Sequence, residues 1–166
     1  MIKSLSFFIC ILGSLLITAP HSLYARAHLS PYERQILAAT VVLEAAGCGH
    51  EGMQAVLNVI FNRADRRIER VIAITVKPGQ FSSLNSVTRQ RHPNYSPILR
   101  RAMKDKHFAT AYRLVLSLER GKLTDNTSGA DHYYAISMRE SPDWAKHMDY
   151  ISRIGGHHFL RSRPGA

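Results

Sequence analysis

Residues 51–66, EGMQAVLNVIFNRADR, decide the fold class of this chain. Apolar side chains recur in them three or four positions apart, which makes one face of a helix apolar and the other polar. The apolar face consists of Met53, Val56, Leu57, Ile60, Phe61 and Ala64. Because a helix must bury such a face against other elements, the pattern predicts a helical domain with a shared core.

The segment before this helix carries the signals of another helix. Residues 30–33, Ser-Pro-Tyr-Glu, provide an N-cap, a proline at the first helical position and a glutamate that completes a capping box. Leu37, Val41 and Glu44 then share one face. Glycines from position 47 onward are expected to end this helix.

The rest of the chain predicts shorter elements. Helices are expected at residues 68–72, 96–103 and 108–118, with a loop at 77–83 and irregular structure at 84–95. Residues 130–135 and 154–160 are expected to form short strands or extended segments. The predicted fold class is therefore mainly α (α+β), a helical domain with a small extended or β element near the C-terminus.

Residues 1–27 have the organisation of a secretory signal peptide. Lys3 supplies the positive start, residues 5–17 are an apolar run, and Ala-Arg-Ala at 25–27 fits the cleavage pattern. The run is shorter than the ~20 residues that a membrane-spanning helix needs, which argues against an uncleaved anchor. We therefore expect residues 28–166 to be a single exported domain, periplasmic or extracellular, with no stable membrane insertion after cleavage.

Charge and cysteine content limit which binding partners and which disulfides are expected for this chain. The chain has a net charge of +10, of which Lys3 and Arg26 in the leader carry two. A basic protein suits an acidic polymer, and export favours the bacterial cell wall over nucleic acid, although basicity also serves solubility alone. Cys48 is the one cysteine outside the leader, so no intrachain disulfide is expected.

Glu44 is the first candidate for chemistry. It ends an apolar helical face beside a glycine-rich break. Partial burial and the negative end of the helix dipole both favour a protonated carboxyl group there. Such a group can donate a proton to a leaving oxygen. Position alone, however, favours the plainer interpretation, in which Glu44 is a solvated side chain at a fraying helix end.

A set of motifs in a fixed order changes that interpretation. They are LEAAG at 43–47, EGMQAV at 51–56, NR at 62–63, KPGQFS at 77–82, GADHYY at 129–134, Trp144 and IGGHHF at 154–159. Together they resemble the SleB-type cell wall hydrolase family, named for spore-cortex-lytic enzymes. The resemblance spans roughly residues 35–160, and it rests on the ordered set because no single motif is decisive.

The resemblance implies a lysozyme-like, mainly helical fold and cleavage of peptidoglycan glycan strands. It implies a lytic transglycosylase with one catalytic glutamate, which falls on Glu44. Cys48 stands where the family often has a second glutamate, so that position offers no second carboxylate. A lytic transglycosylase can use one carboxyl group first as acid and then as base, whereas a hydrolytic glycosidase needs two carboxyl groups. Glu51 is the other nearby acid, and it suits the dipole of its helix better than catalysis.

The motifs also supply substrate-binding candidates. These are Gln80, Phe81, Ser82, His132, Tyr133, Tyr134, Trp144 and His157. In the first loop we expect Gln80 and Ser82 to line a cleft, while Phe81, counted here as a sugar contact, also suits the core. At least one member of the His-Tyr-Tyr run should point into the core, and Trp144 suits core and cleft equally. Because side chains alternate along a strand, only one of the two histidines at 157–158 can face the site.

Four alternatives stay open from the residues. A hydrolytic muramidase or glucosaminidase would cut the same strands. A metal-dependent amidase or peptidase would use His50, His132, His157 or His158 with Glu44, but no tight ligand spacing such as HExxH is present. A cysteine peptidase would use Cys48, which lies in no recognised nucleophile motif. A non-catalytic wall-binding module is the fourth, and neither a metal nor a cofactor is predicted.

Overall fold

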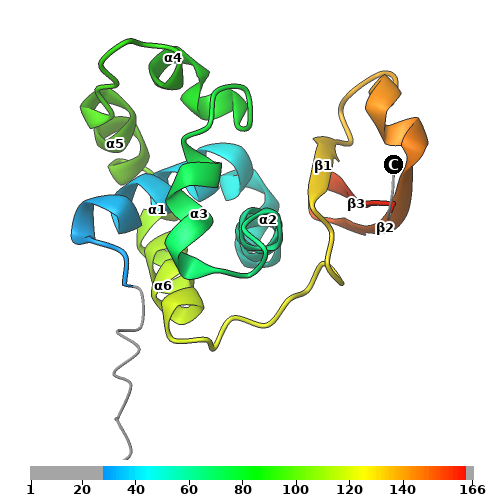
Figure 1. Cartoon of the computed structure of the whole chain (residues 1–166), viewed down its shortest axis with the longest axis horizontal. Coiled ribbons are helices and arrows are strands. Elements are labelled where there is room, and N and C mark those ends of the chain that lie inside the picture. Colours follow the sequence, from blue (N-terminus) through cyan, green and yellow to red (C-terminus); the bar gives the residue numbers. More distant parts are fainter. Residues whose placement is uncertain (1–27, 164–166) are drawn as a thin grey trace, which may run out of the picture.

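The computed structural model describes residues 28–163, so the predicted signal peptide lies outside the described residues. Within this range the chain forms a group of helices and a small antiparallel sheet (Figure 1). None of the described helices has the length and apolar character needed to cross a membrane. The predicted fold class, mainly α with a β element late in the chain, is confirmed.

The elements follow in chain order. The helices are α1 (Pro31–Ala45), η1 (Ala46–Cys48), α2 (Gly49–Arg63), α3 (Ile68–Thr75), η2 (Ser82–Leu84), α4 (Asn85–Thr88), α5 (Ser96–Met103), α6 (Phe108–Glu119) and η3 (Asp143–His147). The strands are β1 (His132–Ala135), β2 (Met148–Ile154) and β3 (His157–Ser162). The predicted irregular stretch at 84–95 thus contains the short helix α4, whose Val87 and Thr88 are buried.

Helix α1 begins with the predicted capping box. The Ser30 hydroxyl accepts a hydrogen bond from the Glu33 amide at 3.3 Å, and the Glu33 carboxylate accepts one from the Ser30 amide at 2.7 Å. Leu37 and Val41 are fully buried, and α1 contacts α2, α5 and α6. This central position fixes the C-terminal end of α1, and therefore Glu44, against the other helices.

A buried ion pair ties α6 back to the start of α1. Glu119, which is 5% exposed, accepts hydrogen bonds from Arg34 Nε at 2.7 Å and from the Leu29 amide at 2.8 Å. Burial alone would raise the pKa of Glu119, but these donors hold it below its ordinary value. The carboxylate therefore stays ionised and joins the two ends of the helical core.

Helix α2 carries the predicted apolar face. Met53, Val56, Leu57 and Ile60 are buried in the helical core. The helix begins two residues earlier than predicted and ends at Arg63 instead of position 66, because the two residues at 65–66 adopt positive φ angles, which no helix interior allows.

The polar face of α2 holds the segment that leads into the sheet. Asn58 donates to the Thr124 carbonyl at 2.9 Å, and Asn62 donates to the Ala130 carbonyl at 2.9 Å. A second small core, which includes Val59 of α2 and Phe159 of β3, joins the sheet to the same helix. The sheet is thereby attached to α2 at a fixed position.

The sheet has the strand order β1-β3-β2, and both pairings are antiparallel. The expectation of one extended segment over residues 154–160 is wrong, because Gly155 and Gly156 turn the chain between β2 and β3. Gly155 has φ +55°, a left-handed conformation that favours glycine. Strand β2 was not predicted at all.

Candidate active site

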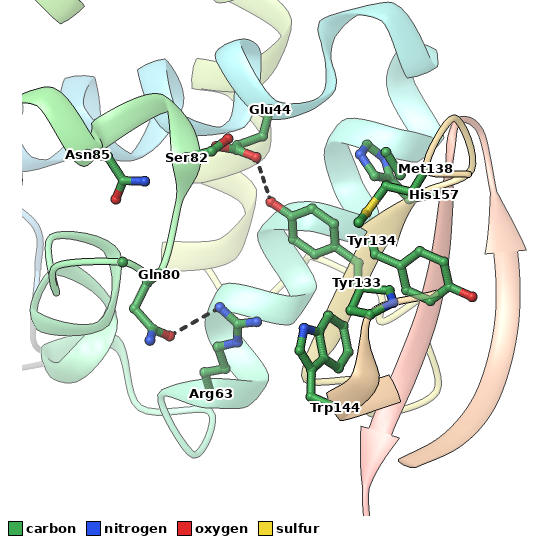
Figure 2. Close-up of a pocket in the computed structure, with 13 residues that line it drawn as sticks. Glu44, Arg63, Gln80, Ser82, Asn85, Tyr133, Tyr134, Met138, Trp144 and His157 are labelled. Carbon is green, nitrogen blue, oxygen red and sulfur yellow. Dashed lines mark hydrogen bonds between the residues drawn. The ribbon is translucent and has the colours of Figure 1, made fainter. Parts of the chain in front are cut away.

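A cleft of about 450 Å³ opens between the helices and the sheet, with Glu44 in its wall (Figure 2). The described residues that line it are Glu44, Arg63, Gly79, Gln80, Ser82, Asn85, Tyr133, Tyr134, Ala135, Met138, Pro142, Trp144 and His157. A second hollow of about 270 Å³ adjoins it and shares Arg63, Gln80, Tyr133 and Trp144. Most of the predicted site residues therefore come together, although they are up to 113 positions apart in the chain.

Glu44 is held by three donors from two other segments. The Tyr133 hydroxyl donates to Oε2 at 3.0 Å, the Ser83 amide donates to Oε1 at 2.9 Å, and the Ser82 hydroxyl donates to Oε1 at 3.3 Å. Figure 2 shows the first of these bonds crossing the cleft from the sheet side. The carboxyl group is thus a fixed, partly buried group, not the freely solvated side chain of a fraying helix end.

Tyr133 connects Glu44, the catalytic candidate, to the sheet. Its ring lies on the inner face of β1, 4.9 Å from the His157 ring and 5.9 Å from the Phe159 ring. Burial, reinforced by the nearby Glu44, raises the pKa of Tyr133 well above its usual value of 10.0. The hydroxyl therefore stays protonated and acts as a hydrogen-bond donor to Glu44. Tyr133 is the member of the His-Tyr-Tyr run that points inward, as predicted.

The loop at 80–82 divides between cleft and core. Gln80 and Ser82 line the cleft as predicted. Phe81 is 2% exposed and packs in the helical core, so its prediction as a substrate-binding residue is wrong, while its prediction as a core residue is confirmed. The reason is alternation: the extended backbone at Phe81 turns its ring inward and its two neighbours toward the cleft.

Aromatic side chains form the opposite wall. Trp144, on η3, is 41% exposed, and its ring lies 5.4 Å from the His132 ring and 6.0 Å from the Tyr134 ring. An exposed indole in the wall of a cleft that also contains Glu44 offers a flat apolar surface, which suits the face of a sugar ring. His132 borders the smaller hollow instead of the main cleft.

His157 is the histidine that faces the site, since it is one of the cleft residues and its neighbour His158 lies on the other face of β3. Burial lowers the pKa of His157, against a smaller opposing effect of Glu44. Its Nδ1 lies 3.5 Å from the Cys48 thiol, which also accepts a hydrogen bond from the Gly156 amide. Cys48 is not among the described residues that line the main cleft, so its thiol contacts His157 from outside the cleft.

Sequence reasoning missed six lining residues, namely Arg63, Gly79, Asn85, Ala135, Met138 and Pro142. Arg63 belongs to a motif that carries the family resemblance, so its sequence signal was present without an assigned role. Gly79 likewise lies in a quoted motif, Ala135 ends β1, and the remaining three lie in loops or short helices with no sequence pattern. Within residues 28–163, no group of three His, Cys, Asp or Glu side chains is arranged to hold a metal ion.

The family model described as Cell Wall Hydrolase matches residues 47–160 of this sequence. The chain belongs to the cell wall hydrolase family. As a member, it is an enzyme that acts on peptidoglycan. The match begins three residues after Glu44, so the role of Glu44 rests on the geometry of the cleft. No curated protein gave a significant match.

Two solved structures share the fold of this cell wall hydrolase. One is the catalytic domain of the germination-specific lytic transglycosylase SleB from Bacillus anthracis, with 24% identity, a TM-score of 0.58, and coverage of 80% of this chain and 97% of that one. The other is the catalytic domain of Bacillus cereus SleB, with 24% identity, a TM-score of 0.58, and coverage of 81% and 93%. At this identity the similarity establishes the fold.

Proposed function

We propose that this cell wall hydrolase is an exported lytic transglycosylase that cleaves glycan strands with Glu44 alone as acid and then base. One observation carries the proposal: among the described residues that line the main cleft and the adjoining hollow, Glu44 is the single carboxylate. A hydrolytic glycosidase needs a second carboxyl group across the scissile bond. The similar Bacillus anthracis structure is the catalytic domain of a lytic transglycosylase, which agrees with this proposal.

The chemistry follows from one carboxyl group used twice. Protonated Glu44 donates its proton to the glycosidic oxygen as the bond from that oxygen to the muramoyl anomeric carbon breaks. The resulting carboxylate accepts the proton of the muramoyl 6-hydroxyl, whose oxygen bonds to the same carbon. A 1,6-anhydro end forms, no water is consumed, and Glu44 regains its proton. Tyr133 and the Ser83 amide, both hydrogen-bonded to Glu44, stabilise the intermediate carboxylate.

The proposal is tested with purified sacculi. The wild-type protein should release soluble fragments that are lighter by one water than hydrolysis products, and Glu44→Gln should release almost none. Fragments with ordinary reducing ends would indicate a muramidase or glucosaminidase. Released peptides with intact strands would indicate an amidase, and binding without any release would indicate a wall-binding module.

The cysteine alternative has its own test, because Cys48 lies near a histidine. A cysteine peptidase would lose all activity in Cys48→Ala, whereas the proposed mechanism expects glycan release to persist in this variant. For export, we expect the protein recovered outside the cytoplasm to begin near residue 28, as mass spectrometry of the intact protein can measure. Recovery of the full-length chain from the cytoplasm alone would contradict the export.

A further inference from the structure

Arg63 places a positive charge in the wall of the cleft without a carboxylate partner. It is the last residue of α2, and its Nε donates to the Asp131 carbonyl while Nη1 donates to the Gln80 side chain at 3.2 Å. Among residues 28–163, the ion pairs within 4.0 Å involve other residues, and Nη2 of Arg63 has no hydrogen-bond acceptor. The guanidinium is thus fixed in position but not neutralised.

This charge is also partly removed from water. Its carbon lies 5.5 Å from the centre of the buried Phe81 ring. Burial lowers the pKa of Arg63, against smaller opposing effects of Tyr133, Asp131 and Glu44. An arginine nevertheless stays charged in a protein. A partly desolvated cation without a counter-ion in direct contact costs stability, and an anionic ligand would offset that cost.

The position of Arg63 connects the two hollows. It lines the main cleft that contains Glu44, and it lines the adjoining hollow with His132 and Trp144. Figure 2 shows its guanidinium on the same side of the cleft as Gln80, below Tyr133 and away from Glu44. A substrate whose sugar lies against Glu44 can therefore extend a substituent along Tyr133 and reach the guanidinium.

The nearest acid is turned away from this path. Asp131 Oδ1 accepts a hydrogen bond from the Ser162 amide at 2.9 Å and lies 2.9 Å from His132 Nδ1. Burial alone would raise the pKa of Asp131, but His132 and Ser162 hold it below its ordinary value. Its backbone carbonyl meanwhile orients Arg63. Asp131 is thus a positioning residue for Arg63 and His132, and its carboxylate forms no ion pair with the guanidinium within 4.0 Å.

We propose that Arg63 binds a carboxylate on the lactyl substituent of the muramoyl residue, with that substituent in the hollow beside His132 and Trp144. The carboxylate belongs either to a stem peptide or to a free lactyl group on a strand without peptides. The planar guanidinium suits this group, because it can form paired, charge-assisted hydrogen bonds with a carboxylate. The inference rests on the proposed function, in which glycan strands occupy this cleft.

The test compares three substrates: strands with intact stem peptides, strands stripped of peptides by an amidase, and strands whose carboxyl groups are converted to uncharged carboxamides. For each protein the readout is the ratio of kcat/KM on charged strands to kcat/KM on the carboxamide strands. A general loss of activity in a variant cancels in this ratio. We expect a ratio of about ten or more for the wild type, and about one for Arg63→Gln.

Two further variants separate recognition from general charge. Arg63→Lys keeps the positive charge but lacks the planar guanidinium group, and it should give an intermediate ratio. Arg100→Gln removes one exposed charge from α5, away from the cleft, and should keep the wild-type ratio. A wild-type ratio near one, or an unchanged ratio in Arg63→Gln, would overturn the inference.

The stripped strands identify the source of the carboxylate. If kcat/KM on the stripped strands still exceeds kcat/KM on the carboxamide strands, Arg63 binds the free lactyl carboxylate. If the two values are equal, the carboxylate belongs to the stem peptide. Cleavage of all substrates with ordinary reducing ends would refute the lytic mechanism and leave this inference standing. If the wild type cleaves none of the three substrates, their binding is measured instead, to Glu44→Gln and to the double variant Glu44→Gln/Arg63→Gln. Equal binding of charged and carboxamide strands to Glu44→Gln would refute the inference.

Discussion

Removing the hydroxyl of Tyr133 isolates the contribution of its hydrogen bond to Glu44. Tyr133→Phe keeps the ring that packs on His157 and Phe159 and removes only the 3.0 Å bond to Oε2. This bond strengthens as Glu44 gives its proton to the substrate and becomes charged, so it stabilises the transition state more than the bound substrate. A hydrogen bond to a charged group contributes about 1.5–3 kcal/mol.

That free energy corresponds to a fall in kcat of roughly 10- to 150-fold, because each 1.36 kcal/mol changes a rate about tenfold. KM should change little. The assay is the initial rate of soluble glycan release from sacculi at several substrate concentrations, with thermal unfolding to verify the fold. Tyr150→Phe is the matched control, since Tyr150 is 58% exposed and lies on β2 outside the cleft. A Tyr133→Phe variant with the wild-type kcat would refute the role assigned to this hydroxyl.

Three further predictions concern stability and binding. Glu119→Gln should lower the free energy of unfolding by about 2–4 kcal/mol in urea titrations, because Arg34 loses its buried partner. Since the pKa of Glu119 is depressed, the difference in stability between wild type and variant should hold at neutral pH and shrink as the pH falls below about 4.5. Gly52→Ala should lower the melting temperature, because its Cβ would lie 2.3 Å from that of Cys48; an unchanged value would show that η1 can move. Trp144→Ala should raise KM about 2- to 10-fold with little change in melting temperature, and an unchanged KM would place sugar binding elsewhere.

The helical half of the fold could be predicted because its signals are local. The capping box at Ser30 and the periodic face of α2 depend on residues three or four positions apart, and both occur as predicted. Even there, the end of α2 was misplaced by three residues. The positive φ angles of Asp65 and Arg66 stop the helix; aspartate adopts this conformation more often than most residues do, but a following arginine does not indicate it.

The sheet was harder to predict because an irregularity hides its period. Strand β2 pairs with β3 through a register shift between Tyr150 and Ser152. A bulge of this kind inserts an extra residue, so apolar side chains no longer alternate along MDYISRI. The pattern that would have indicated a strand is therefore interrupted in the middle of the strand.

The candidate site could be predicted as a set of residues but not as an arrangement. Motif order led to Glu44, Gln80 and Trp144, which all line the cleft. The same loop motif suggested Phe81 as a sugar contact, yet its ring faces the core. Arg63 lay in a motif without a role, because its significance depends on the absence of an acid within reach, which is a property of three-dimensional distances.

The sequence by itself determined the helical class, the capped start of α1 and a carboxyl group at the end of α1, since these follow from interactions between near neighbours. Only the tertiary structure decided what Glu44 can do. It brought the Tyr133 hydroxyl, 89 positions away, to 3.0 Å from the carboxylate and left Glu44 as the single acid among the described lining residues. Such contacts arise from the attachment of the sheet to α2, which local sequence patterns do not encode.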